Sequence, residues 1–171
     1  MKKVAVFGKP GGGKSTLSKK LSAATGIKLY PLDLIAYKKN GERVAPEKYA
    51  EAHEKIINSD SWIIDGLGTL ESLRARINAA DTLIYIDLPY WVHYWWVTKR
   101  LMLSLFVKPE GWPDESSVLK GTFESWKYLR MSPQFWTSEF FKNVQDSAKN
   151  KSLHRITTTR ELEIFVKKFT A

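Results

Sequence analysis

The sequence has no cysteine among its 171 residues. Disulfide bonds and thiolate metal sites are therefore both excluded, and the absence favours an intracellular protein. Histidine is also scarce. His53, His93 and His154 are scattered along the chain, and no two of them have the spacing of metal ligands. We assign none of these histidines a catalytic role.

The sequence also lacks an apolar run of the ~20 residues that a membrane-spanning helix needs. Its most aromatic stretch, residues 90–96, contains His93 and is soon followed by Lys99 and Arg100. The N-terminus leads directly into an apolar run at Val4, so we expect no signal peptide and a cytoplasmic location. There is no internal repeat and no low-complexity tail. We expect a single domain over residues 1–171.

Acidic residues are the minority charge: 18 Asp and Glu stand against 27 Lys and Arg, a formal charge of +9. This excess suits an anionic ligand such as a nucleotide, and it also suits nucleic acid. The basic residues are spread in pairs such as Lys2-Lys3, Lys19-Lys20 and Lys167-Lys168 and form no tail, which is typical of solvated helix faces. A small anionic ligand is therefore favoured over nucleic acid.

The motif that carries most information runs from Gly8 to Ser15 and reads GKPGGGKS. It matches the phosphate-loop pattern in full and lies between the apolar run Val4–Phe7 and a segment with Leu17 and Leu21 at helical spacing. Glycines let main-chain N–H groups approach a polyphosphate, and the following helix adds positive potential. Lys14 is expected at the β and γ phosphates, and Ser15 on Mg²⁺. The expected nucleotide-binding residues are Gly8, Lys9, Gly11, Gly12, Gly13, Lys14, Ser15 and Thr16.

Strand-like and helix-like segments alternate after this motif. Further strands are predicted at 27–30, 62–64, 82–86 and 152–157. Helical segments are predicted at 46–58, 69–79, 90–106, 116–131, 133–149 and 160–169. This alternation predicts an α/β fold of three layers, a parallel sheet with helices on both faces.

Three aspartates lie at or just beyond the ends of predicted strands, where proteins of this build place their chemistry. They are Asp33, Asp65 and Asp87. Asp65 is suited to hold Mg²⁺ opposite Ser15. Its alternative role is to cap the helix that begins near Thr69, and the metal role is favoured.

The sequence contains two kinds of residue that are suited to bind a phosphoryl acceptor. A hydroxyl acceptor profits from a carboxylate that orients it and takes its proton, a role that suits Asp33. A phosphate acceptor instead needs cations, and several arginines offer bidentate contacts. The sequence contains both. The arginines are Arg43, Arg74, Arg76, Arg100 and Arg130.

Two further segments have alternative interpretations. The stretch 108–115 is rich in the helix-breaking residues proline and glycine. It is either the tip of a mobile lid that spans about 101–123, or an inert surface loop. At helical spacing Trp91, Tyr94 and Trp95 share a face that continues to Thr98 and Met102. Core packing is the favoured interpretation of that face. Stacking on a nucleobase and attachment to a membrane surface are the alternatives.

These residues together resemble the adenylate-kinase-like branch of P-loop kinases, and more narrowly the bacterial DNA topology modulation proteins. The matching pieces are Gly8–Ser15, Leu32-Asp33, 62–66, Arg74, 80–82, 87–89 and Lys99-Arg100, within roughly the first hundred residues. The resemblance implies a five-stranded parallel sheet of order 2-3-1-4-5, a helical lid, and ATP with Mg²⁺. It also implies an acceptor pocket between Asp33 and Arg74, and an Arg100 that begins the lid and reaches the transferring phosphoryl group. Leu67-Gly68 departs from the family pattern, in which Asn-Tyr is common.

The sequence therefore predicts an ATP- and Mg²⁺-dependent kinase of a small nucleoside-like or phosphorylated acceptor. Its expected catalytic residues are Lys14, Asp33 and Arg100, its acceptor-binding residues Asp33, Asp65 and Arg74, and its metal ligands Ser15 and Asp65. Two alternatives belong to other classes: a nucleotide-gated regulator that binds nucleic acid with weak ATPase activity, and an ATP-binding interaction partner that has lost its acceptor.

Overall fold

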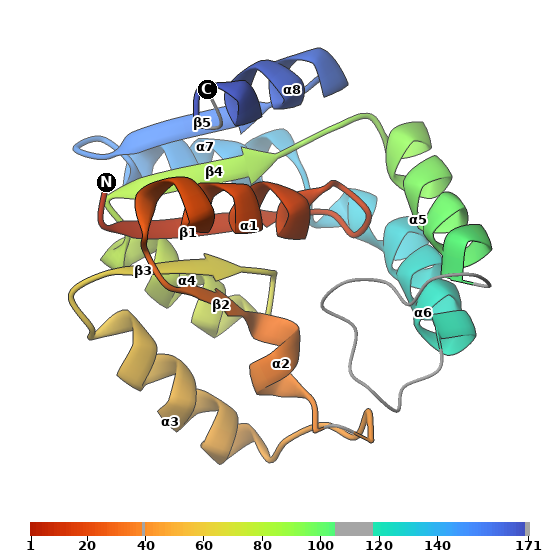
Figure 1. The fold of residues 1–171 in the computed structure, drawn as a ribbon, viewed down its shortest axis with the longest axis horizontal. Helices are drawn as coiled ribbons and strands as arrows, with labels where there is room; N and C mark the ends of the chain where they lie inside the picture. The colour runs from red at the N-terminus through yellow and green to blue at the C-terminus, as the bar shows by residue number, and fades with distance from the viewer. Residues whose placement is uncertain (39, 105–117, 170–171) are drawn as a thin grey trace.

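A parallel sheet of five strands forms the centre of the protein, with helices packed on both of its faces (Figure 1). The structure is a computed structural model, and it describes residues 1–38, 40–104 and 118–169. The strands are β1 (Lys3–Gly8), β2 (Leu29–Pro31), β3 (Trp62–Asp65), β4 (Thr82–Ile86) and β5 (Ser152–Ile156). The helices are α1 (Lys14–Thr25), α2 (Leu32–Ala36), α3 (Pro46–Ile57), α4 (Leu70–Ala79), α5 (Tyr90–Ser104), α6 (Val118–Met131), α7 (Ser138–Ser147) and α8 (Thr159–Lys167), with a 3₁₀ turn at Ser132–Gln134.

The order of the strands is β2-β3-β1-β4-β5, so the predicted order 2-3-1-4-5 is confirmed. The central strand β1 pairs with β3 on one side and with β4 on the other. Its register places Val6 beside Asp65 and Gly8 beside Ile86. The carboxyl ends of β1, β3 and β4 therefore lie together at one edge of the sheet, which is where the phosphate loop begins.

The strands next to the centre are buried along their whole length because the sheet is covered on both faces. Val4 and Val6 pack with Leu17 and Leu21 of α1 and with α8 on one face. Ala5 and Phe7 pack toward α4 and α7 on the other face, where the rings of Phe7 and Tyr85 stack 5.3 Å apart. The three layers are thus helix, sheet and helix, as predicted.

Two predicted elements differ from the observed ones. The second strand was expected at 27–30 but is Leu29–Pro31, because Gly26 ends α1 in a left-handed conformation and the Ile27 carbonyl accepts a hydrogen bond from Ser22. The predicted helix at 133–149 is divided. A 3₁₀ turn ends before α7, and α7 has a new N-cap at Thr137, whose hydroxyl accepts a hydrogen bond from the Phe140 amide.

Helices α5 and α6 pack against each other at the end of the molecule toward which the strands point (Figure 1). The breaker-rich stretch 108–115, predicted as a lid tip or a surface loop, lies outside the described residues. None of the helices that the structure describes is long and apolar enough to cross a membrane.

Candidate functional site

The loop between β1 and α1 has a conformation that only glycines allow. Gly11 and Gly13 have φ angles of 67° and 78°, in the left-handed region that side chains disfavour. A Cβ atom on Gly11 would lie 2.6 Å from Cγ2 of Val97, and one on Gly12 would lie 2.9 Å from Cε1 of His93. Both neighbours belong to α5, so that helix supports the loop from outside.

The N-terminus of α1 is left open for an anion. Neither a side-chain cap nor an acidic residue is present in its first turn, and its N-cap is Gly13. The first amides of a helix have no partner within the helix, and they carry its positive partial charge. An uncapped helix start behind a glycine loop is therefore suited to bind phosphate oxygens.

Lys14 begins this helix and turns back over the loop, where its Nζ donates a hydrogen bond of 2.8 Å to the Lys9 carbonyl oxygen. Burial lowers the pKa of Lys14, the carboxylates of Asp65 and Asp33 raise it, and the cations Arg100 and Lys9 lower it. The ammonium group of Lys14 is therefore close to two carboxylates, Asp65 at the end of β3 and Asp33 in α2.

Asp65 is the last residue of β3, and only 5% of it is exposed. Its Oδ1 is buried and has no hydrogen-bond partner among the described residues. Burial raises the pKa of Asp65, whereas the Lys14 charge and a hydrogen bond with the Ser15 side chain lower it. The alternative prediction that Asp65 caps the next helix is wrong, because Thr69 caps α4 and accepts a hydrogen bond from the Ser72 amide.

The donor set at Asp65 fits a magnesium ion. A buried carboxylate oxygen without a partner beside a serine hydroxyl offers the hard oxygen ligands that Mg²⁺ prefers. Ser15 itself is exposed, so its hydroxyl is accessible to a ligand.

Asp33 and Arg100 complete this cluster from two other elements. Asp33 lies in the first turn of α2 and is exposed. Arg100 lies on α5, and its Nη2 donates to the Ser125 hydroxyl of α6 at 3.4 Å. Burial lowers the pKa of Arg100, and the charge of Asp33 opposes that shift. Lys14, Asp33, Asp65 and Arg100 therefore come together from α1, α2, β3 and α5.

Arg74 is not part of that cluster among the interactions of the described residues. It is exposed on α4, whereas Arg76, two residues later, is 1% exposed and donates from Nη2 to the Leu67 carbonyl. Burial lowers the pKa of Arg76 to about 10, although Tyr49 and Asp65 act in the opposite direction. Arg76 thus supports the loop after β3. Its position next to Ile77 and three residues after Leu73, on the buried face of the helix, was the pattern that could have identified it.

The side chain of Lys9 is directed toward the end of β4. Its Nζ forms a buried ion pair with Asp87, which follows β4. Asp87 also accepts hydrogen bonds from Nε and Nη2 of Arg155 at 3.0 and 2.6 Å. Any contact of Lys9 with a phosphate would therefore come from its main chain. Of the three aspartates at this edge of the sheet, Asp87 is already neutralised by two cations.

His93 has a structural role that sequence reasoning missed. It is fully buried, and its Nδ1 lies 2.8 Å from the Pro10 carbonyl oxygen. Because a carbonyl only accepts, Nδ1 carries the proton. Burial lowers the pKa of His93 to about 4, against the raising effect of the hydrogen bond to Pro10. A neutral histidine therefore fastens the loop to α5, and no spacing in the sequence pointed to this contact.

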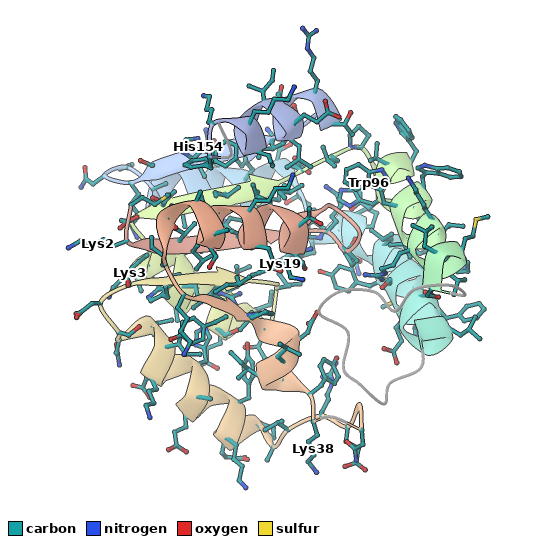
Figure 2. All side chains as sticks on the ribbon, in the orientation of Figure 1. Lys2, Lys3, Lys19, Lys38, Trp96 and His154 are labelled. Carbon is teal, nitrogen blue, oxygen red and sulfur yellow. The ribbon has the colours of Figure 1, made fainter. Side chains whose placement is uncertain are left out.

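The prediction that the aromatic face of α5 packs in the core is wrong for Trp91, Trp95 and Met102. These side chains are 72%, 57% and 59% exposed. The buried side of α5 instead carries Val92, His93 and Val97. Trp96 lies beside the loop, with Cζ3 3.1 Å from a Cβ built on Gly13 (Figure 2). The side of α5 that faces the loop is therefore opposite to the predicted face.

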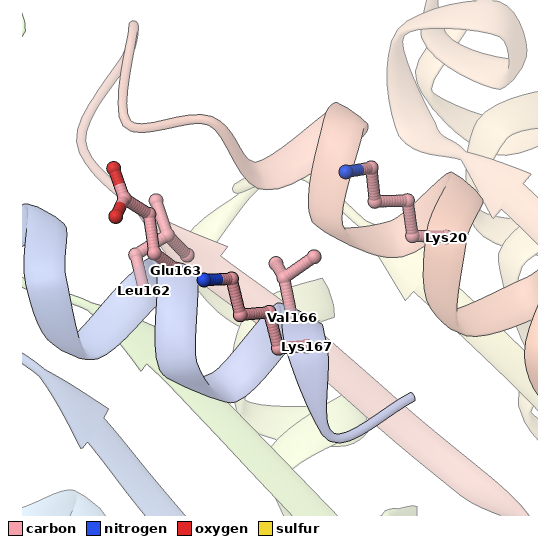
Figure 3. A pocket seen from close by; sticks show the side chains of 5 residues that line it. All are labelled: Lys20, Leu162, Glu163, Val166 and Lys167. Carbon is pink, nitrogen blue, oxygen red and sulfur yellow. The ribbon is translucent and has the colours of Figure 1, made fainter. Parts of the chain in front are cut away.

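A surface hollow of about 400 Å³ lies between α1 and α8 (Figure 3). It is lined by Lys20, Leu162, Glu163, Val166 and Lys167. Lys14, Asp33, Asp65 and Arg100 are not among the residues that line it.

Comparison with known proteins yields one kind of match. No protein-family profile matches the sequence, and no curated protein matches it. Among solved structures, the chain is similar to a shikimate kinase from Acinetobacter baumannii in complex with shikimate, with 14% sequence identity and a TM-score of 0.57. The match covers 98% of this chain and 90% of that one. The similarity shows that the chain shares the fold of that protein, so the predicted three-layer P-loop fold is confirmed. The narrower resemblance to DNA topology modulation proteins stays a prediction.

Proposed function

We propose that the protein is an ATP- and Mg²⁺-dependent phosphotransferase that moves the γ-phosphoryl group to a small nucleoside-like or phosphorylated acceptor. The observation that carries this proposal is the cluster of Lys14, Asp33, Asp65 and Arg100 beside an uncapped helix N-terminus. The similar fold of a kinase whose structure holds the small molecule shikimate supports the same class of reaction.

In this proposal the loop amides and Lys14 bind the β and γ phosphates. The carboxylates of Asp65 and Asp33 oppose the effect of burial on Lys14 and so favour its charged form. Arg100 is close enough to Asp33 for their charges to interact, and it neutralises the transferring phosphoryl group. Catalysis then comes mainly from positioning and charge neutralisation.

Ser15 and Asp65 are the residues that would hold Mg²⁺. The ion, when bound, supplies positive charge to the phosphate oxygens. Asp65 is well placed for this because its buried Oδ1 has no protein partner among the described residues.

The acceptor would approach from the side of α2. The exposed carboxylate of Asp33 orients an acceptor hydroxyl and takes its proton as the hydroxyl oxygen forms a bond to the γ phosphorus. The bond between that phosphorus and the bridging oxygen breaks, and ADP leaves with the electron pair. Arg74, exposed on α4, remains a proposed acceptor contact through the family resemblance.

Substitution of Lys14 tests the proposal. We expect Lys14→Ala to reduce phosphoryl transfer by about 100-fold or more, as loss of one charge-stabilising donor does. Lys48→Ala on α3, an exposed lysine far from the loop in sequence, is the matched control and should keep full activity. A folded Lys14→Ala protein that transfers phosphate at the normal rate would overturn the mechanism.

The acceptor is identified by calorimetric titration of nucleosides, nucleoside monophosphates and sugars into the protein with a non-hydrolysable ATP analogue and Mg²⁺. Binding of one class, followed by its phosphorylation with ATP, would support the proposal. Analogue binding without any acceptor in the panel would favour the interaction-partner alternative. The nucleic-acid alternative depends only on the net charge of +9 and on the narrower family resemblance, so we do not propose it.

A further inference from the structure

Large exposed apolar side chains are concentrated on two helices. Of eleven such residues in the described part of the chain, seven belong to α5 and α6. Monomeric proteins rarely leave an apolar surface of this kind uncovered unless it binds something. The seven residues are Trp91, Trp95, Met102 and Leu103 on α5, and Leu119, Phe123 and Met131 on α6.

The exposed residues form a stripe on each helix. Trp91, Trp95 and Met102 are spaced by four and seven residues, so they share one side of α5. The opposite side of that helix, with His93 and Val97, packs against the phosphate loop. The stripe is therefore the side left over after the loop has been supported, and neither the fold nor the proposed chemistry uses it.

The α6 stripe combines apolar and basic residues. Leu119 and Phe123 are one helical turn apart, and the exposed Lys127 and Arg130 continue the same side of the helix. The two helices pack together, and Arg100 of α5 reaches Ser125 of α6. Figure 2 shows side chains projecting from both helices at the end of the molecule away from α3. We name the two stripes together, with the seven apolar residues and Lys99, Lys127 and Arg130, the α5–α6 face.

The charges of the α5–α6 face are mainly of one sign. Helix α5 contains Lys99 and Arg100 and no acidic residue, and Glu124 is the single acidic residue of α6. A second copy of the chain would bring the same basic face and another net charge of +9, which disfavours self-association. A nucleic-acid duplex would pair with the cations but, with its bases already stacked, would leave the tryptophans and methionines in water.

We propose that the α5–α6 face binds the surface of an anionic phospholipid membrane. Tryptophan rings have an apolar body and a polar N–H, and they are enriched where hydrocarbon meets water. Lysine and arginine beside them would contact the phosphate and serine headgroups. The helices lie on the membrane and do not cross it, since none of the described helices can span one.

Vesicle binding by the full chain tests this proposal. The probe is vesicles of phosphatidylcholine with or without phosphatidylserine, and the measurement is flotation together with the emission shift of tryptophan. We expect binding to the anionic vesicles that weakens with salt. The double variant Trp91→Ser/Trp95→Ser should lose affinity by ~10-fold or more. Lys99→Gln/Lys127→Gln should lower the affinity for anionic vesicles by about fivefold for each charge removed.

Matched controls distinguish binding through this surface from nonspecific hydrophobic adsorption and from a nonspecific effect of net charge. Ile164→Ser on α8 removes an apolar side chain that is 49% exposed, close to the exposure of Trp95. Lys48→Gln/Lys55→Gln on α3 removes two exposed charges elsewhere. Both controls should bind vesicles as the natural sequence does, and the melting temperatures of all variants should agree because every substituted side chain is exposed.

Three results would overturn the proposal. The first is equal binding to neutral and anionic vesicles, or no binding to either. The second is vesicle binding that the tryptophan variant leaves unchanged. The third is a dimer in sedimentation velocity, or a duplex complex, that the tryptophan variant abolishes, because either would assign the α5–α6 face to a different occupant. None of these outcomes depends on whether the chain transfers phosphate.

Discussion

The ion pair behind the phosphate loop provides a sharp test of how the site is built. The Lys9 side chain is 3% exposed and that of Asp87 is 16% exposed, whereas that of Arg155, the second cation on Asp87, is 42% exposed. In Asp87→Asn the shape is kept but the negative charge is lost. Arg155 can then turn toward water. Lys9 cannot, so a buried cation remains without its anion.

The expected cost of Asp87→Asn is about 3–5 kcal/mol of the free energy of unfolding, as for other buried pairs that lose one partner. For a chain of this length that corresponds to a fall of about 6–20 °C in melting temperature. Urea unfolding and thermal melts at neutral pH measure both quantities. Because Lys9 also accepts the hydrogen bond from Lys14, the affinity for an ATP analogue should fall as well.

Two further variants distinguish a buried charge from a lost contact. In Lys9→Met/Asp87→Asn the unpaired cation is gone, so most of the stability should return, because apolar replacement of a buried pair is often neutral. Arg155→Gln should cost no more than about 1 kcal/mol, since this pair is half exposed to solvent. A loss below about 1 kcal/mol in Asp87→Asn, or a double variant no better than the single one, would refute the reasoning.

The same pair has a consequence at acid pH. Burial alone would raise the pKa of Asp87, but hydrogen bonds from Lys9 and Arg155 outweigh it and lower the pKa below 3.8. A carboxyl whose folded pKa is depressed contributes stability above its unfolded pKa and loses it as the pH falls through the folded value. Below about pH 4 the stability of Asp87→Asn should therefore depend less steeply on pH than that of the natural chain.

Two other predictions concern the loop. Gly11→Ala should destabilise the protein and weaken binding of an ATP analogue, because its Cβ would meet Val97 at 2.6 Å; Gly26→Ala, with a similar φ of 70° but nothing within 4 Å, is the matched control. Calorimetry and urea unfolding compare them, and equal effects would contradict the role of close packing. His93 has a folded pKa of about 4 against 6.5 when unfolded, so the unfolded chain binds more protons in that interval and stability falls as pH decreases from about 6.5 to 4. His93→Asn should make the dependence of stability on pH shallower. The pH dependence that remains would come from His53, whose pKa is also about 4. An unchanged slope of the urea midpoint against pH would show that His93 is accessible to protons in the folded protein.

The sheet was predictable because each strand is specified locally. Val4–Phe7, Trp62–Ile64 and Thr82–Ile86 are apolar at every position but one, a pattern that only strands covered on both faces need. The phosphate loop was predictable for a similar reason, since its glycines are required by the conformation of the loop itself. The order of the strands came from the family resemblance, because no local pattern says which strands become neighbours.

The roles of individual charged residues were harder to predict. Arg74 and Arg76 are two residues apart on one helix, and which of them is buried depends on the packing of α4 against the sheet. Lys9 belongs to the phosphate-loop motif, yet its side chain pairs with Asp87, which is 78 residues away in sequence. Such pairings depend on which residues become neighbours in the folded protein, and a single sequence does not show that.

Helix α5 shows why the aromatic face was assigned to the wrong side. Periodicity identifies the buried side of a helix only when the other side is polar. In α5 both sides are apolar: His93, Trp96 and Val97 contact the loop, and Trp91 and Trp95 are exposed. The loop itself decides between them. Glycines at 11, 12 and 13 leave room for one helix to approach, and the side chains opposite to the exposed tryptophans fill that room. The exposed stripe is therefore not part of the core, and a binding partner explains its two tryptophans better than the fold does.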